Sequence, residues 1–372
     1  MLIAADKFKG SLTAVEVAGH VAAGLRRARP GTEVEALPVA DGGDGTVAAA
    51  VAAGFARHTR EVTGPTGEPV TAAWALRGTT AVVEMAEASG LQHLPGGVPA
   101  PLTATTHGSG ELIAAALDAG ARTLVFGVGG SATTDGGAGM LTALGARLLT
   151  AEGTPVGPGG AALAELARAD LSGLDPRLAE VDLVLASDVD NPLTGPTGAA
   201  AVYGPQKGAD EDDVRTLDAA LTHYARVLTE ALGDRVAEAA EAPGAGAAGG
   251  IGFGALVGLG ARFRPGIEVM LDVLGFADAL GPRRPGPGEG SLDTQTLHGK
   301  APAGVAAAAR ARGVDTVAVC GRLALDAEAL EKAGIRRAYA LAEIEPDPER
   351  CFSEAGPLLE KIARTLGEEW LA

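Results

Sequence analysis

The stretch LVFGVGGSATTDGGAGM, residues 124–140, is the clearest indicator of how this chain folds. An apolar run over residues 124–128 predicts a buried strand, and the Ala- and Leu-rich segment after residue 137 predicts a helix. The loop between them presents backbone N–H groups at a helix start, where phosphate binds well. Its candidate donors are Gly129, Gly130, Ser131 and Thr133. The same glycines would also suit a tight turn against a closely packed helix, and local features leave both interpretations open.

Both ends of the chain repeat this order of strand, glycine-containing loop and helix. Residues 2–5 predict a strand, 14–28 a helix capped by Ser11 or Thr13, and 33–39 a second strand that runs into ADGGDGT. The last hundred residues predict helices at 302–312, 326–332 and 354–367, with strands at 316–319 and 337–340. Such alternation is typical of a parallel sheet covered by helices, with ligands at the carboxyl ends of the strands.

The pattern changes near Gly64. Three short β-type runs, at residues 57–63, 70–76 and 80–85, are separated by turn clusters and predict an antiparallel meander. We therefore expect two dissimilar α/β domains. Residues 1–63 and 276–372 would form a doubly wound domain of the Rossmann or flavodoxin type, and residues 64–275 an inserted mixed α/β domain, with the active site in the cleft.

Composition excludes several classes of protein. The chain has 372 residues, 55 of them glycine, only 3% aromatic residues, and a formal charge of −17. This charge repels nucleic acid and anionic lipid, so we expect neither as a partner. Two cysteines are too few for a disulfide framework or a four-thiolate zinc site, and the first residues do not resemble a secretory signal, so we expect a cytoplasmic protein. A glycine-rich apolar stretch at residues 247–261 is too short to span a membrane and predicts a buried helix.

Carboxylates and lysines recur in the glycine-containing loops. Asp is common in turns and Lys on surfaces, so no single one indicates a site. Together they could hold Mg²⁺ and an anionic ligand, since Mg²⁺ uses one or two carboxylates together with phosphate oxygens. The carboxylates are Asp6, Asp41, Asp44, Asp135, Asp188, Asp190 and Asp293, and the lysines are Lys7, Lys9, Lys207 and Lys300.

Two sequence patterns are rejected. GAGAAG at residues 244–249 matches the dinucleotide-binding pattern but follows a charged helical stretch and a proline instead of a strand. No Walker-type P-loop occurs, because Gly299-Lys300 is followed by alanine and lacks the glycine required upstream.

Six segments, in one order along the chain, resemble the bacterial type-1 glycerate kinases of the GarK and GlxK kind. They are DKFKGS at 6–11, ADGGDGT at 40–46, GGSATTDGGAGM at 129–140, SDVDNPLTGPTGA at 187–199, YGPQKGA at 203–209 and GEGSLDTQTLHGKAP at 288–302. The resemblance implies ATP- and Mg²⁺-dependent phosphorylation of D-glycerate on its 2-hydroxyl, in a cleft between two α/β domains. It leaves the oligomeric state open.

The resemblance also implies roles for the loop residues. Nucleotide contacts would come from Gly129, Gly130, Ser131, Thr133, Asp135 and Glu289. Charge partners for phosphate or the glycerate carboxylate would be Lys7, Lys9, Lys207 and Lys300. Asp188 or Asp41 would hold Mg²⁺, and the hydroxyl proton would pass to Asp188, Asp190 or Asp293.

One segment departs from this family. Residues 281–287 read GPRRPGP where relatives have an apolar strand, and prolines remove ladder donors, so we expect this strand to be absent or displaced. Three alternatives to a glycerate 2-kinase stay open. They are a kinase of another small hydroxy acid, because such pockets differ by one or two side chains, a kinase of the 3-hydroxyl, and an acid-binding homologue whose catalysis is impaired by residues 281–287. A Rossmann dehydrogenase is a more distant one.

Overall fold

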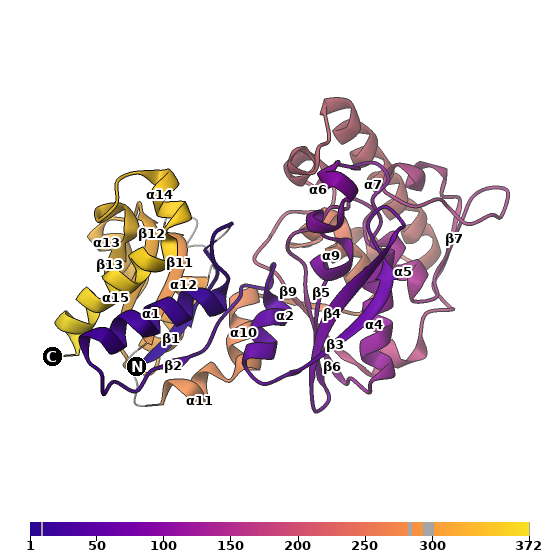
Figure 1. Cartoon of the computed structure of the whole chain (residues 1–372). Coiled ribbons are helices and arrows are strands. Elements are labelled where there is room, and N and C mark those ends of the chain that lie inside the picture. Colours follow the sequence, from indigo (N-terminus) through magenta and orange to yellow (C-terminus); the bar gives the residue numbers. More distant parts are fainter. Residues whose placement is uncertain (9, 282–284, 293–300, 372) are drawn as a thin grey trace. The chain divides into compact units, whose positions relative to one another are not determined.

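A computed structural model describes residues 1–372 except 9, 282–284, 293–300 and 372 (Figure 1). The chain is a mixed α/β protein, as predicted, and folds into two compact units. The first unit comprises Met1–Asp41, Ala48–Gly54 and Pro265–Ala372, and the second comprises Gly42–Val47 and Phe55–Arg264. The domain bounds 1–63, 64–275 and 276–372, and the cleft location of the active site, stay predictions.

The first unit contains a parallel five-stranded sheet in the order β13-β12-β11-β1-β2. Its strands are β1 (Leu2–Ala5), β2 (Glu35–Ala36), β11 (Pro285–Leu292), β12 (Thr316–Leu323) and β13 (Ile335–Ala340). Its helices are α1 (Ala14–Ala28), α2 (Thr46–Ala52), α10 (Gly266–Leu274), α11 (Phe276–Leu280), α12 (Ala301–Arg310), α13 (Ala327–Lys332), α14 (Pro348–Ser353) and α15 (Ala355–Trp370). The first two residues of α2 belong to the second unit.

Helices cover both faces of this sheet because successive strand residues point to opposite sides. Val317 and Val319 of β12 pack with α1 and α15, which lie side by side (Figure 1). Ala318 and Cys320, the alternate residues, pack with α12 and α13 instead. The first unit is therefore a sheet with an apolar core on each face.

The expected absence of a strand at residues 281–287 was wrong, whereas its displacement stays a prediction. Strand β11 forms and lies between β1 and β12, with Pro285 opposite Leu2 and Pro287 opposite Ala4. The two prolines are two residues apart, so their nitrogens point to the same side of the strand. Pairing with β12 begins only at Gly288, after both prolines, so a proline-free stretch forms that ladder. Residues 282–284 lie outside the described part of the chain.

The second unit is built on a mixed six-stranded sheet in the order β10-β9-β6-β5-β4-β3. The predicted antiparallel meander is confirmed in β3, β4 and β5, which are consecutive in the chain. Strands β6, β9 and β10 run parallel to β5. The strands are β3 (Ala56–Thr63), β4 (Pro69–Arg77), β5 (Thr80–Glu84), β6 (Thr123–Gly127), β9 (Asp182–Ala186) and β10 (Arg262–Arg264). Strands β7 (Arg147–Leu149) and β8 (Arg168–Asp170) form a separate antiparallel pair.

Two apolar clusters form the core of the second unit. One contains Leu112 of α4, Phe126 of β6 and Ile251 of α9, and the other contains Tyr224 of α7 and Phe253 of α9. The helix predicted from the apolar stretch at 247–261 is confirmed as α9, and no helix in the described residues is long and apolar enough to cross a membrane. The helices of this unit are α3 (Ala86–Ser89), α4 (His107–Asp118), α5 (Ala138–Ala143), α6 (Ala199–Tyr203), α7 (Glu211–Leu232), α8 (Arg235–Glu241) and α9 (Ala247–Leu259).

Helix α1 begins with a capping box. Thr13 Oγ1 accepts the Glu16 N–H at 3.2 Å, and the Glu16 carboxylate accepts the Thr13 N–H at 2.8 Å. We expect Thr13→Ala to lower the free energy of unfolding by about 1 kcal/mol, because it leaves a helix N–H without its partner. Urea unfolding measures the change. Thr365→Ala on the exposed side of α15, which removes no cap, is the control, and an equal loss in both variants would contradict the assignment.

Candidate functional site

Three parallel strands of the second unit end at the same level. Glu84 of β5 pairs with Gly127 of β6, and Gly127 pairs with Ala186 of β9. The chain that continues from β6 contains Gly129, Gly130 and Ser131, and the chain that continues from β9 contains Asp188 and Asp190. The structure thus brings the predicted phosphate loop and two predicted carboxylates to one edge of one sheet.

A third loop, Gly42–Val47, packs on this edge by close backbone contact. A Cβ at Gly42 would lie 2.5 Å from the Ala186 carbonyl oxygen, and one at Gly129 would lie 2.4 Å from the Gly43 Cα. Real Cβ atoms do not approach so closely, and Gly42 has a φ of 89°, which favours glycine. Glycine is therefore required where the loops touch.

Asp44 brings a further carboxylate to the phosphate loop. A Cβ built on Gly130 would lie 1.8 Å from Asp44 Oδ1, so the Asp44 side chain occupies the space directly over Gly130. The sequence singled out Asp44 as one of several loop carboxylates but gave it no role. The Asp44 carboxylate therefore lies directly beside the glycine loop that follows β6.

Glu84 holds the Gly42–Val47 loop in place and was missed by the sequence reasoning. Its two carboxylate oxygens accept the N–H groups of Gly45 and Val47, each at 3.0 Å. The side chain is buried, and burial raises the pKa of Glu84 to about 7 against the opposing effect of these two hydrogen bonds. An acid that ends a buried apolar strand was the available signal, because such a residue must find donors.

Asp135 lies inside the protein, where it joins the starts of two helices. Its carboxylate accepts the Thr106 N–H at 2.8 Å and the Thr106 hydroxyl at 2.9 Å, and it accepts the Gly137 and Gly139 N–H groups at 3.1 and 3.3 Å. Burial raises the pKa of Asp135, and these hydrogen bonds oppose that rise. The side chain therefore fills the position at which a helix start would otherwise receive an anion.

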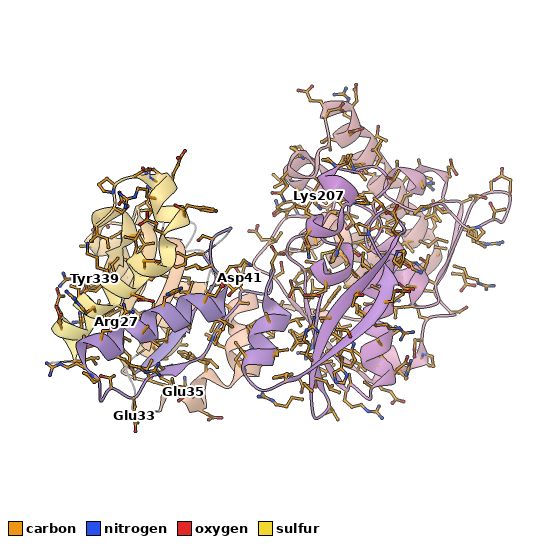
Figure 2. All side chains as sticks on the ribbon, viewed as in Figure 1. Arg27, Glu33, Glu35, Asp41, Lys207 and Tyr339 are labelled. Atoms are coloured by element: carbon orange, nitrogen blue, oxygen red, sulfur yellow. The ribbon has the colours of Figure 1, made fainter. Side chains whose placement is uncertain are left out.

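Lys207, labelled in Figure 2, is also buried. Only 1% of the residue is exposed. Its Nζ donates to the Thr133 carbonyl at 2.6 Å. Burial lowers the pKa of Lys207 to about 7, and the charge of Asp135 acts in the opposite direction. Lys207 thus contacts the phosphate loop from inside the fold, and this loop also contains Thr133, whose buried hydroxyl bonds to no other described residue.

The loop after β9 is held by side-chain contacts of its own. Tyr203 donates its hydroxyl to Asn191 Oδ1 at 2.6 Å, and Asn191 Nδ2 donates to the Thr197 carbonyl at 2.8 Å. Burial raises the pKa of Tyr203, and the charge of Asp190 raises it further. Tyr203 is therefore a neutral phenol that donates a hydrogen bond within this loop.

The remaining predicted residues belong to the first unit or lie outside the described residues. Asp6 and Lys7 follow β1, and the Lys7 N–H donates to Asp6 Oδ1 at 2.6 Å. Asp41 ends the segment that runs beside β1, where the Val39 N–H donates to the Ala5 carbonyl at 2.9 Å. Glu289 lies in β11, but its side chain is not described. Lys9, Asp293 and Lys300 lie outside the described residues.

Comparison with known proteins gives consistent matches over the chain. A family model described as "Glycerate kinase family" matches residues 1–371. A glycerate kinase of Bacillus subtilis is 46% identical over 375 residues, which cover 98% of this chain and 96% of the relative. A glycerate 2-kinase of Escherichia coli is 44% identical over 346 residues, which cover 92% and 90%. The crystal structure of a candidate glycerate kinase 2 from Salmonella typhimurium LT2 superposes with a TM-score of 0.84 at 41% identity, covering 99% of this chain and 97% of the other.

The raised pKa of Glu84 predicts a pH-dependent stability. The folded protein binds this proton more tightly than the unfolded chain, so the stabilisation is complete below about pH 4.5 and is lost as pH rises through about 7. We expect the difference in free energy of unfolding between wild type and Glu84→Gln to fall by about 3 kcal/mol between these limits, because the amide cannot ionise. Urea unfolding at a series of pH values measures it.

The exposed residue Glu152 supplies the control for this experiment. Glu152→Gln should follow the wild-type pH dependence. If the difference in free energy of unfolding between wild type and Glu84→Gln stays constant from pH 5 to 8, Glu84 ionises normally in the folded protein.

Close backbone contact at Gly42 gives a second prediction. Gly42→Ala places a Cβ against the Ala186 carbonyl, whereas Gly67→Ala, at a φ of 97°, meets no atom within 4 Å. Both variants bear the cost of a left-handed alanine, about 1–2 kcal/mol. We expect Gly42→Ala to lose roughly 1–3 kcal/mol more than Gly67→Ala because of the added contact. Equal losses in urea unfolding would refute the close contact.

Proposed function

The chain belongs to the glycerate kinase family, and from this we propose that it transfers the terminal phosphoryl group of ATP to the 2-hydroxyl of D-glycerate, giving ADP and 2-phosphoglycerate. The observation that carries the proposal is the shared edge of β5, β6 and β9, where a glycine loop and carboxylates lie together in a chain that matches the family over residues 1–371. Phosphoryl transfer depends mainly on positioning and charge stabilisation, which such an edge supplies.

The phosphates of ATP would bind the first part of the loop after β6. Gly129 and Gly130 are partly exposed, whereas the residues from Ser131 to Gly137 are buried. We therefore assign the phosphate contacts to the Gly129 and Gly130 backbone first. Ser131, Thr133 and Asp135 would act on the nucleotide through the shape of the loop, and Glu289 remains a predicted contact.

The donor set at this edge fits Mg²⁺. Asp44 beside Gly130 and Asp188 after β9 provide hard carboxylate oxygens. This is the arrangement in which Mg²⁺ takes its other ligands from phosphates and water. Bound there, Mg²⁺ would neutralise charge on the phosphates, and Asp41 is a further candidate ligand.

The acceptor hydroxyl needs a base, and the substrate carboxylate needs a cation. Asp188 and Asp190 are the described candidates for the base, because both follow β9 at the site, and Asp293 remains a further one. Lys7 is the described lysine assigned to the anionic ligand, together with Lys9 and Lys300. Lys207 is assigned to the loop instead, since its Nζ bonds the Thr133 carbonyl.

The comparisons favour this activity over the alternatives. The E. coli relative at 44% identity is a glycerate 2-kinase, which favours the 2-hydroxyl and glycerate itself. The alternative of a catalytically impaired homologue rested on the loss of the strand at residues 281–287, and that reason no longer holds because β11 is formed. We further propose that the two compact units are the two domains and that the protein is cytoplasmic. The units differ from the predicted bounds, since residues 42–47 and 55–63 belong to the second unit and residues 265–275 to the first.

A coupled assay tests the proposal. ADP release with D-glycerate, ATP and Mg²⁺ is expected at roughly 1–100 per second, and removal of Mg²⁺ with EDTA should abolish it. Phosphorus NMR of the product separates 2-phosphoglycerate from 3-phosphoglycerate. A folded protein without turnover on glycerate, or with 3-phosphoglycerate as product, would refute the proposal.

Asp188→Asn tests the carboxylate edge. We expect kcat to fall at least a hundredfold, whether Asp188 accepts the proton or holds the metal, because either role needs the charge. Asp182→Asn at the opposite end of β9 is the matched control and should stay within threefold of wild type. Similar kcat values for the two variants would move the chemistry away from this edge.

A further inference from the structure

The segment GAGAAGG, residues 244–250, has an unusual backbone and no role in the proposed function so far. Ala248, Gly249 and Gly250 have φ values of 53°, 77° and 89° at the start of α9. Ala248 is the single non-glycine residue with positive φ among the described residues. Such a conformation is unfavourable for an alanine, and it persists only where surrounding contacts enforce it.

The left-handed turn packs directly on the phosphate loop. A Cβ at Gly249 would lie 1.9 Å from the Thr133 carbonyl oxygen, and one at Gly250 would lie 2.9 Å from the Gly136 Cα. The Gly136 N–H donates to the Gly249 carbonyl at 3.0 Å. The two backbones therefore touch without intervening side chains, so a shift of one must shift the other.

Lys207 acts on the same carbonyl from a different element. It follows α6, and its Nζ donates to the Thr133 oxygen at 2.6 Å. One carbonyl of the phosphate loop is thus held by a buried amine and packed against a glycine α-carbon. Few loop positions could be restrained more closely by neighbouring elements.

The same segment reaches the loop that contains the carboxylates. The Gly246 N–H donates to the Asn191 carbonyl at 2.9 Å, and a Cβ at Gly246 would lie 2.3 Å from the Pro192 carbonyl oxygen. Asn191 directly follows Asp190 in the chain. A five-residue stretch, 246–250, therefore contacts both loops that leave the carboxyl ends of β6 and β9.

We propose that residues 246–250 and Lys207 form a brace that sets the distance between the phosphate loop and the Asp188–Asp190 loop, and that they are positioning residues for phosphoryl transfer. This inference rests on the proposed function. In-line transfer is sensitive to displacement, and an error of about 1 Å between reacting groups can cost a hundredfold in rate. A rigid left-handed turn would prevent this displacement. This role gives a reason for the positive φ of Ala248.

Two glycine variants in α9 test the brace. Gly249→Ala forces the turn away from Thr133, whereas Gly258→Ala, in the same helix, meets only the flexible end of the Leu141 side chain at 2.3 Å. We expect Gly249→Ala to lower kcat at least thirtyfold while KM for D-glycerate changes less than threefold. Gly258→Ala should keep kcat within threefold of wild type. The assays are run well below the melting temperatures of both variants.

Lys207→Met keeps the test valid if Gly249→Ala fails to fold. Methionine fills a similar volume, so the variant should still fold and lose mainly the hydrogen bond to the Thr133 carbonyl, and it is assayed well below its own melting temperature. We nevertheless expect its kcat to fall at least tenfold, with KM for ATP and for glycerate changed less than threefold. A lysine that bound phosphate directly would instead raise KM for ATP when removed.

The double variant separates a shared brace from two independent effects. If Gly249 and Lys207 act through the Thr133 carbonyl, their effects should not multiply. The kcat of Gly249→Ala combined with Lys207→Met should then lie within threefold of the kcat of the slower single variant. Two outcomes would overturn the brace. One is a decrease in kcat of the double variant equal to the product of the two single decreases, and the other is a kcat within threefold of wild type for both Gly249→Ala and Lys207→Met. Wild-type protein without glycerate kinase turnover would refute the proposed function instead. Hydrogen exchange of the Gly136 amide, which donates to the Gly249 carbonyl, would then test the brace by itself: we expect faster exchange in Gly249→Ala than in Gly258→Ala, and equal exchange would overturn the brace.

Discussion

Contact between glycine backbones is the constraint on which the second unit depends. Where Gly42 meets Ala186, Gly129 meets Gly43 and Gly249 meets Thr133, the separations leave no room for a Cβ. A chain with 3% aromatic residues cannot fill space between its loops with large side chains, so it brings the backbones together. The edge of β5, β6 and β9 is consequently fixed by contacts between main-chain atoms, which adapt less than side chains do.

Buried ionisable groups complete this arrangement. Glu84, Asp135 and Lys207 each bond backbone groups of the surrounding loops and lie almost wholly inside the protein. Burying such groups is costly unless they are hydrogen-bonded, and here each bond fixes a loop that bears candidate site residues. The charges that the proposed reaction uses and the charges that hold its loops are therefore different residues, although Asp135 and Lys207 lie in the same kind of sequence motif as the candidate site residues.

Strand β11 shows how a correct local rule led to a wrong prediction. Prolines do remove ladder donors, and GPRRPGP contains three of them. The rule assumed that both neighbours pair along the whole strand. In the structure β12 pairs only from Gly288 onward, and Pro285 and Pro287 point their nitrogens to one side. The strand survives because its two ladders are staggered, which is a property of the neighbours and not of the segment.

Local pattern was sufficient for much of this protein. Alternating strand and helix signals predicted the mixed α/β fold, the turn clusters predicted the meander of β3, β4 and β5, and the order of six motifs indicated the family. Tertiary structure decided the rest: Glu84 at the site, Lys207 and Asp135 inside the fold, the place of Gly42–Val47 in the second unit, and the left-handed turn at Ala248. Periodicity reports which face of an element is apolar, but burial of a charged side chain and the handedness of a single residue depend on segments distant in sequence. Only the folded chain brings those segments together.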